Sequence, residues 1–491
     1  MTAPEPATVD LRLVPAALTC WLVTATGLFW GPWAAATAVG VAGVAMAVIA
    51  HRTHAVRVSA VLAVVAVGIA FALTVALRLH ALATHPLAAL VGSTVWVTFA
   101  PTESPRPIAG GRLMFAATVH AVRDIESSGR VMVFAPATGY EQASAGRPMA
   151  VRARVGKPRR RDLSVAVLAA VGEPRWGTAS TAQRAGARVR ADFAEAARLT
   201  LPPDQAALLP GLVLGDTAGF SAEDTAEFRR SGLTHLTAVS GANVSIVCGA
   251  VLLSAMLVGP RAAVALAALA LLAFVVVVQP SASVLRSAAM GSVMLLGILA
   301  RRRRQAIPAL AATVLALMVI SPEMSVDVGF ALSVSATAAL VTFTPMWSQW
   351  LVTRGWPKPI ADAVCVALAA HVVTAPLVAA ISGQFSVIAV MANLLVAPVI
   401  PPITILGTAA AAVGCLWPGA AALLIRFTGP ELWWLLKVAH GSAALPGAAI
   451  AVPSGWGGAL VVGSVTIGAA VLPWLWRRLR CPTGMKRSTG E

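Results

Sequence analysis

The polar residues that could do chemistry gather where apolar segments begin. His235, Ser240 and Asn243 lie in GLTHLTAVSGANV, at the start of one apolar segment, and Asp216 lies in the acidic, glycine-rich stretch before it. Polar groups at such positions are costly unless they line water or pair with one another. They predict either the lining of a polar path or a Ser/Gly helix-packing seam with His235 at the membrane interface.

A serine near a histidine could also be a nucleophile with its base. AVSGA is not a G-x-S-x-G elbow, and the five-residue spacing of His235 and Ser240 points their side chains in different directions on one helix. The chain has no HExxH and no Walker A motif. We therefore expect that the protein is not an enzyme and has no catalytic residues, no cofactor and no metal.

Two charged residues lie in or beside later apolar segments. Arg286 falls inside QPSASVLRSAAMGS, and Asp327 stands at the start of SVDVGFALSVSA, with Ser333 beyond it. An intramembrane arginine is a functional candidate by default, unless it snorkels outward or pairs with Asp327 as pure structure.

Prolines interrupt the apolar sequence near Asn393. Pro376 precedes Asn393, and Pro398, Pro401 and Pro402 follow it. Proline-broken helices at membrane depth usually line a cavity, because the freed backbone groups need partners. Asn393 is therefore another candidate for the path.

The amino-acid composition indicates a membrane protein. The 491 residues are 58% hydrophobic and 12% charged, so we expect a polytopic α-helical membrane protein with about ten to twelve transmembrane helices. The expected spans are 13–31, 33–50, 58–82, 235–259, 261–279, 284–300, 306–320, 328–345, 360–381, 386–400, 403–416 and 456–476. The segment 420–446 is either interfacial or a further span.

The positions of the basic loops predict the membrane topology. The net charge is +17, and the basic loops at 51–57 and 301–304 fall on one side if the N-terminus starts in the cytoplasm. Both termini are then cytoplasmic, and the polar region after residue 84 is extracytoplasmic. We divide the chain into 1–84, N-terminal spans; 85–175, soluble domain; 176–231, amphipathic and linker helices; 232–480, membrane channel domain; and 481–491, basic cytoplasmic tail.

The soluble domain has a β pattern. Short β-branched runs at 91–100, 111–122, 129–135, 148–155 and 163–171 fit a small OB-like barrel, with a meander or sandwich as the alternative. The following 184–200 stretch predicts a basic amphipathic helix at the membrane surface.

Basic residues in this domain could gather phosphates, with Trp96, Phe115, Phe134 or Tyr140 for base stacking. The candidates are Arg123, Arg130, Arg152, Arg154, Lys157, Arg159, Arg160 and Arg161. The run RVGKPRRR could instead dock on anionic lipid.

Several motifs follow one another along the chain: LVLGD (212–216), SAEDTAEFRRSGLTHLTAVSGANVSIV (221–247), PSASVLRSAAM (280–290), SPEMSVDVGFALSVSA (321–336) and the TAP…F…N…P series (374–398). Their order resembles that of the ComEC family of competence proteins, which are inner-membrane channels for transforming DNA. The resemblance implies an OB-like outer domain and a DNA path through the later spans.

Two features depart from the family pattern. Many members have Leu-His where this chain has Ala242-Asn243. Many also end in a metallo-β-lactamase-like domain, whereas this chain ends soon after its last span without a metal-ligand cluster. The resemblance therefore implies a variant lacking that domain, with strand degradation left to another protein.

The resulting hypothesis is a channel in the cell inner (plasma) membrane that translocates single-stranded DNA into the cytoplasm during natural transformation. Its expected partners are single-stranded DNA, the lipid bilayer, a separate nuclease, a DNA receptor and a cytoplasmic motor or helicase. The alternatives are a small-solute or lipid transporter and an intramembrane hydrolase using Ser240.

Overall fold

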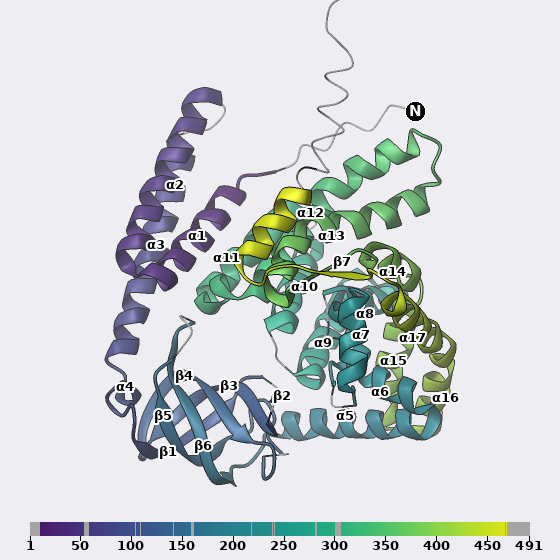
Figure 1. The fold of residues 1–491 in the computed structure, drawn as a ribbon, viewed down its shortest axis with the longest axis horizontal. Coiled ribbons are helices and arrows are strands. Elements are labelled where there is room, and N and C mark those ends of the chain that lie inside the picture. Colours follow the sequence, from purple (N-terminus) through teal and green to yellow (C-terminus); the bar gives the residue numbers. More distant parts are fainter. Residues whose placement is uncertain are drawn as a thin grey trace, which may run out of the picture. The chain divides into compact units, whose positions relative to one another are not determined.

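A computed structural model describes most of the chain (Figure 1). The described residues are 10–53, 58–103, 105–108, 110–140, 142–158, 162–217, 219–237, 239, 241–279, 282–299, 306–466 and 468. Contacts divide the chain into two compact units. Unit 1 consists of Met1–Ala222, Thr234–Val334 and Ala397–Leu436, and unit 2 consists of Glu223–Leu233, Ser335–Val396 and Lys437–Glu491.

Apolar helices confirm a polytopic α-helical membrane protein. Among the described residues, six helical segments are long and apolar enough to cross a membrane, or up to seven with the bent pair α14 (Ala389–Val396) and α15 (Ile400–Gly414). The six are α2 (Pro32–Thr53), α3 (Val58–Ala83), α8 (Gly241–Ala255) with the turn η2 (Met256–Val258), α9 (Pro260–Val278), α12 (Val328–Val352) and α13 (Lys358–Ser382).

Shorter apolar helices occupy other expected spans. They are α1 (Val14–Trp30), the stretch Val284–Ile298 of α10 (Ala282–Leu299), α11 (Ala306–Ile320), α16 (Pro418–Phe427) and the segment Trp456–Thr466. Because these helices fall below the usual length of a crossing, the number of ten to twelve spans stays a prediction.

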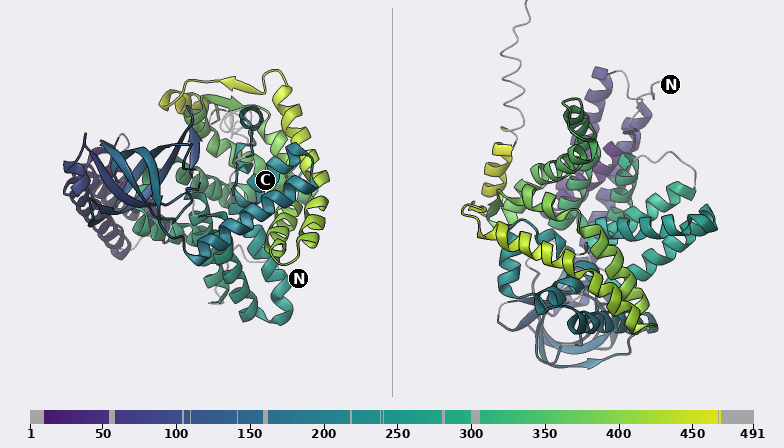
Figure 2. Two further views of the ribbon diagram at one scale, coloured as in Figure 1. Left: turned by 90° about the horizontal axis from the view of Figure 1, so that it is seen from below. Right: turned by 90° about the vertical axis from the view of Figure 1, so that its right-hand side faces the viewer.

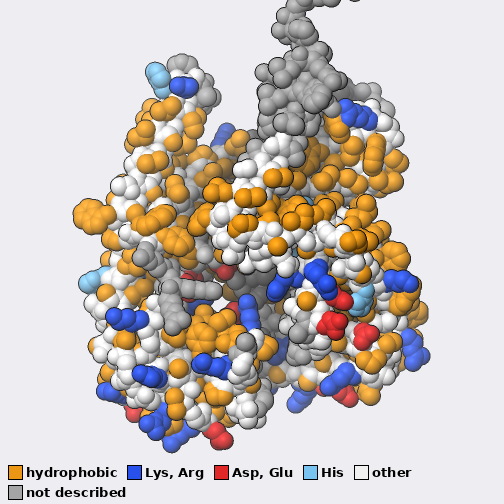
Figure 3. All heavy atoms as spheres, viewed as in Figure 1, with side chains coloured by type: hydrophobic (Ala, Val, Ile, Leu, Met, Phe, Trp, Pro, Cys, Tyr) orange, Lys and Arg blue, Asp and Glu red, His pale blue; other side chains and the backbone are white. Residues whose placement is uncertain are grey.

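Small residues allow the first three helices to pack closely. A Cβ added to Gly27 on α1 would lie 2.8 Å from Val75 of α3, and one added to Gly68 on α3 would lie 3.1 Å from Val39 of α2. Close approach of this kind favours helix association in lipid, where no hydrophobic effect acts between helices. Exposed apolar side chains such as Leu73 cover the outside of α2 and α3 (upper left in Figure 3), as lipid contact requires.

The polar region folds into a closed barrel (Figures 1 and 2). Its strands are β1 (Thr94–Pro101), β3 (Arg112–Val122), β4 (Ile125–Pro136), β5 (Met149–Gly156) and β6 (Ser164–Trp176). β1 pairs with both β3 and β5, which closes the order β1-β3-β4-β6-β5, and β4 runs parallel to β6. Closure and the parallel pair exclude a meander or sandwich and confirm an OB-like barrel. A sixth strand, β2 (Arg106–Ile108), pairs with β3.

The barrel interior holds apolar and aromatic side chains. Phe99, Phe115 and Tyr140 are fully buried in its core, where each apolar side chain of this size contributes roughly 1.5–3 kcal/mol. The Tyr140 hydroxyl donates to the carbonyl of Gly172 at 3.1 Å, and burial raises the pKa of Tyr140 to about 12. Phe115 and Tyr140 therefore fill the core, and the expectation that they could stack on bases was wrong.

Three helices and a turn connect the barrel to α8. They are α5 (Thr181–Thr200), α6 (Pro203–Leu214), α7 (Ala222–Arg230) and η1 (Thr234–Leu236). α5 begins at a capping box formed by Ser180 and Gln183. Its apolar face packs against α6 and α9, with Phe193 and Ala197 buried. The predicted amphipathic helix is present, and protein covers this part of its apolar face.

Unit 2 contains a small two-stranded sheet. β7 (Gln384–Ser386) pairs antiparallel with β8 (Ala449–Ala451). Ala375 and Ala379 of α13 pack there with Val462. The expected 420–446 segment consists of two helices, α16 and α17 (Gly429–Ala444), which meet at Thr428.

Candidate nucleic-acid path and capture surface

Arg286 on α10 is the most completely buried charged residue among the described residues, with 6% of its whole-residue surface exposed. Its Nη1 lies 3.6 Å from Asp327 Oδ1, and its Nε is buried without a hydrogen-bond partner. A guanidinium has five N–H donors, and burying it is costly unless an anion compensates the charge. With one long ionic contact among the described residues, Arg286 retains the capacity to bind a second anion.

Asp327 is positioned by the start of α12. Its Oδ1 accepts a hydrogen bond from the backbone N–H of Phe330 at 2.6 Å, which is an N-cap interaction. The Asp327 side chain is 43% exposed, whereas that of Arg286 is 8% exposed. A Cβ on Gly329 would lie 3.1 Å from Asp327 Oδ1 and 3.7 Å from Arg286 Nη1. The absence of a side chain at Gly329 therefore leaves space beside the ion pair, whose Asp327 carboxylate is accessible to solvent.

The structure brings two polar motifs together at α8 and α10. A Cβ added to Gly241, at the start of α8, would lie 3.3 Å from Oγ of the buried Ser287, which follows Arg286. Asn243 is also buried, and its Nδ2 donates to the carbonyl of Leu212 at 2.8 Å. Asn243 thereby joins α8 to the last turn of α6.

A small cavity lies beside Asn243. Its volume is about 10 Å³, which is roughly the room that one water molecule needs. Leu212, Leu236, Asn243, Ile400, Ile403 and Thr404 line it. This space is too small for a nucleotide, so Asn243 acts in helix contacts in this conformation.

The other predicted path residues lie on separate elements. Asp216 is half-buried after α6, His235 is exposed on η1, and Ser333 is half-buried on α12. Asn393 belongs to unit 2, where its Nδ2 donates to the Ala389 carbonyl of its own helix at 2.8 Å. Ser240 lies outside the described residues.

The predicted pairing of Arg286 with Asp327 is present, and Ser287 is a neighbour that the sequence did not single out.

The barrel presents a basic and aromatic surface, which we call the Trp96 face. Trp96 on β1 is 39% exposed and lies opposite Arg152 of β5 in the strand register. The exposed Arg154 lies two residues further along β5. Arg175 of β6 places its guanidinium carbon 4.6 Å from the Trp96 ring centroid, a cation–π distance. The sequence did not single out Arg175, because strand pairing brings this residue to Trp96.

The other capture candidates differ in their surroundings. Arg123 and Lys157 are exposed, and the Arg123 backbone N–H donates to the Trp96 carbonyl at 3.1 Å. Phe134 is half-buried beneath the guanidinium of Arg112. The remaining three, Arg159, Arg160 and Arg161, lie outside the described residues.

Arg130 lies in an ion pair within unit 1. Its Nη1 is 2.9 Å from Glu323 Oε1, and its Nε is buried without a hydrogen-bond partner. Glu323 belongs to η3 (Pro322–Val326), the short turn before Asp327. The Trp21 ring N–H of α1 donates to the Ser325 carbonyl of the same turn at 2.8 Å. The turn η3 therefore contacts the barrel and α1 and leads directly to the partner of Arg286.

Comparisons with known proteins agree on one family. The family model for competence proteins matches residues 212–477. The chain is also 28% identical over 200 residues to ComE operon protein 3 of Bacillus subtilis (strain 168). That alignment covers 40% of this chain and 25% of the relative, so the similarity spans about a quarter of the relative's length. No solved structure matches the chain.

The family match includes most of the elements that carry the candidate path. Residues 212–477 contain the start of α8, the Arg286–Asp327 pair, η3 and Asn393. The matched region exceeds half of the chain and agrees with the order of motifs in the sequence. The chain therefore belongs to the competence protein family, the ComEC family that its motifs resemble.

Proposed function

We propose that this protein is a channel in the bacterial inner membrane that admits single-stranded DNA to the cytoplasm during natural transformation. Membership of the competence family and the name of the Bacillus relative support a role in DNA uptake. The observation that carries the channel role is Arg286, a deeply buried cation for which the described part of the chain supplies one long ionic contact. A phosphate chain needs positive charge where water is scarce.

In this proposal the barrel faces the outside and captures the strand. The Trp96 face combines one aromatic ring with Arg152, Arg154 and Arg175, the residue types that stack on bases and bind phosphates. The exposed Lys157 follows β5 directly and adds positive charge at the connection to β6, which OB-like barrels use for binding. By sequence, Arg159, Arg160 and Arg161 belong to the same stretch. Arg130 contributes less, because Glu323 already neutralises it.

Arg286 and Asp327 then act in sequence on the strand. The carboxylate holds the guanidinium in place while the path is empty, and a phosphate displaces it during passage. Both termini face the cytoplasm, and no covalent step is assigned to this chain.

The test is transformation frequency in a deletion strain complemented with variants of the full chain. Arg286→Ala is expected to lower the frequency by about 100-fold or more, because loss of a buried charge interaction costs about 3 kcal/mol or more. Arg286→Lys should retain part of the activity, and Asp327→Asn should stay within about tenfold of the parent because it leaves the cation. Arg261→Ala, at an exposed arginine in the first turn of α9, is the matched control.

Membrane abundance of each variant is measured by immunoblot, and the double variant Arg286→Ala/Asp327→Asn avoids leaving an unpaired acid. Normal uptake by Arg286→Ala at normal abundance would overturn the channel role of this residue. Equal losses in Arg286→Ala and Asp327→Asn would show a purely structural ion pair. Unchanged transformation after deletion of the chain would favour the small-solute transporter.

A further inference from the structure

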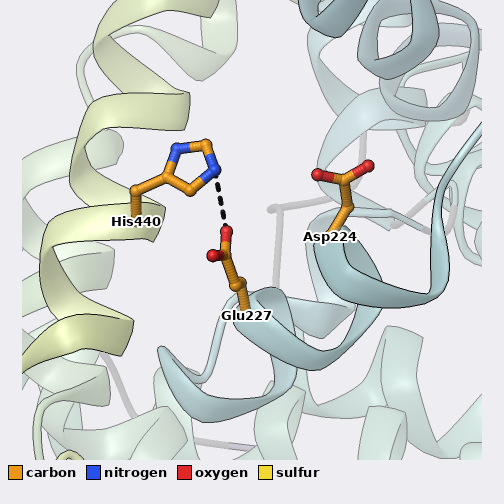
Figure 4. A group of neighbouring side chains, drawn as sticks. All are labelled: Asp224, Glu227 and His440. Carbon is orange, nitrogen blue, oxygen red and sulfur yellow. Dashed lines mark ion pairs between the residues drawn. The ribbon is translucent and has the colours of Figure 1, made fainter.

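Three metal-ligating side chains meet in unit 2 (Figure 4). Asp224 and Glu227 lie on α7, and His440 lies on α17, far away in the sequence. The ligand atoms that the three offer all lie within 4.8 Å of one another. His440 Nε2 and Glu227 Oε2 are 2.8 Å apart. The group therefore supplies two oxygen donors and one nitrogen donor to a common point.

The two acids share one face of α7 because they are three residues apart. Phe228 beside them is buried, which fixes the rotation of this short helix. The helix ends against β7, where the Ser386 hydroxyl donates to the Arg230 carbonyl at 2.8 Å. Packing thus sets the direction of both carboxylates before any ligand binds.

Helix α17 presents its histidine in a similarly fixed way. Val438 and Ala439 beside His440 are buried, whereas the His440 side chain is 50% exposed. The Glu227 side chain is only 16% exposed. The group therefore has a nearly buried carboxylate on one side and solvent access on the other.

Charge favours a cation at this point. Two carboxylates this close repel each other, and a proton on His440 would supply only one positive charge. A divalent ion bound by a neutral imidazole balances both carboxylates. The mixture of imidazole and carboxylate donors suits borderline ions such as Zn²⁺, and three protein ligands leave a position open for water.

We propose that Asp224, Glu227 and His440 bind one Zn²⁺ ion, which joins α7 to α17. The alternative is that Glu227 and His440 form an ion pair and nothing more. This inference does not depend on DNA transport. Local sequence motifs could not reveal the group, because its donors come from two helices that only the fold brings together.

The experiment measures Zn²⁺ binding by the purified full chain in nanodiscs, using competition with a chromophoric chelator and elemental analysis. We expect one equivalent to be lost, or its affinity to fall by about tenfold or more, in Asp224→Asn, Glu227→Gln and His440→Gln. Co²⁺ should give a visible absorption band in the parent that these variants lack. Binding should weaken as the pH falls, because a ligating histidine must be neutral.

Asp224→Asn is the decisive variant, since it leaves the Glu227–His440 pair in place. Glu223→Gln is the matched control, because Glu223 is the exposed acid next to Asp224 on α7. Retention of Zn²⁺ affinity by well-folded Asp224→Asn and His440→Gln proteins would overturn the proposal. An equal loss in Glu223→Gln would also overturn it, because it would indicate general surface charge. Each preparation is checked by size-exclusion profile, and a variant that fails this check is replaced by Glu227→Asp, which should bind with intermediate affinity.

Discussion

At the scale of single residues, Arg286 is a buried cation whose ionic contact with Asp327 is long. An arginine inside an apolar segment identified Arg286 as a candidate, and the sequence analysis named Asp327 as its possible structural partner. The structure shows the pair and also its length, 3.6 Å. It also shows the buried Nε without a hydrogen-bond partner. The long distance and the unpartnered Nε distinguish an incompletely compensated cation from a salt bridge with full hydrogen bonding. Neither detail can be predicted from the spacing of residues in the sequence.

Trp96 carries a prediction at this scale. Trp96→Ala should weaken binding of oligo-dT by about 5- to 150-fold, since stacking is worth about 1–3 kcal/mol per base. Arg152→Ala should reduce the slope of log affinity against log salt by about 0.7, because one phosphate contact is lost. The measurement is fluorescence anisotropy of a labelled oligonucleotide with the full chain in nanodiscs.

The control for this experiment is Arg106→Ala, because Arg106 already pairs with Glu103 at 3.1 Å. Equal effects of Trp96→Ala and Arg106→Ala would show that the Trp96 face has no special part in capture. A parent protein that binds anionic vesicles but no oligonucleotide would identify the basic barrel as a lipid-docking domain.

At the scale of elements, η3 has more contacts than its length suggests. Within a few residues it contacts Arg130 of the barrel through Glu323 and Trp21 of α1 through Ser325. Asp327, which pairs with Arg286, follows directly. A shift of the barrel relative to α1 would therefore move η3 and change the position of Asp327 at the start of α12. We regard η3 as the element that orients Asp327.

The Glu323–Arg130 pair tests this view. Glu323→Gln should speed hydrogen exchange in η3 and in β4 around Arg130, because it leaves a half-buried guanidinium without its carboxylate. A double-mutant cycle with Arg130→Gln should give a coupling energy of about 0.5–3 kcal/mol. Exchange is measured on the full chain in nanodiscs.

The matched control is Glu126→Gln, at an exposed acid of the same strand. Additive effects of Glu323→Gln and Arg130→Gln would contradict a direct interaction. Faster exchange in the control as well would show that any loss of negative charge loosens the strand.

At the scale of the whole molecule, we propose that the barrel lies outside the cell membrane and that the end of α2 lies on the cytoplasmic side. Cysteine labelling tests this topology directly. A cysteine at Thr138, in an exposed turn of the barrel, should react with an impermeant maleimide in intact spheroplasts, whereas one at His51, at the end of α2, should not. The five natural cysteines are replaced by alanine. Labelling of both sites after permeabilisation is the control, and labelling of His51→Cys in intact cells would reverse the topology.

The sequence predicted the apolar helices and the five barrel strands because periodicity and β-branched runs are local signals. It missed β2, which has three residues and contains Pro107, too short and irregular for a pattern. It also offered Phe115 and Tyr140 as alternatives for base stacking, because the inward face of a strand depends on closure of the barrel. The pairing of Arg175 with Trp96 depends on strand register, which hydropathy does not encode.

In the channel that we propose, the Arg286–Asp327 pair also affects the response to voltage. As a neutral pair it feels little net force from the membrane potential. An inside-negative potential opposes each phosphate charge that crosses inward by about 2.3 kcal/mol per 100 mV. A phosphate that displaces Asp327 from Arg286 meets a fixed positive charge that offsets part of this barrier where the ion pair stood. While the proposed channel is empty, the ion pair therefore has no net charge. The positive charge of Arg286 becomes available only when a polyanion enters.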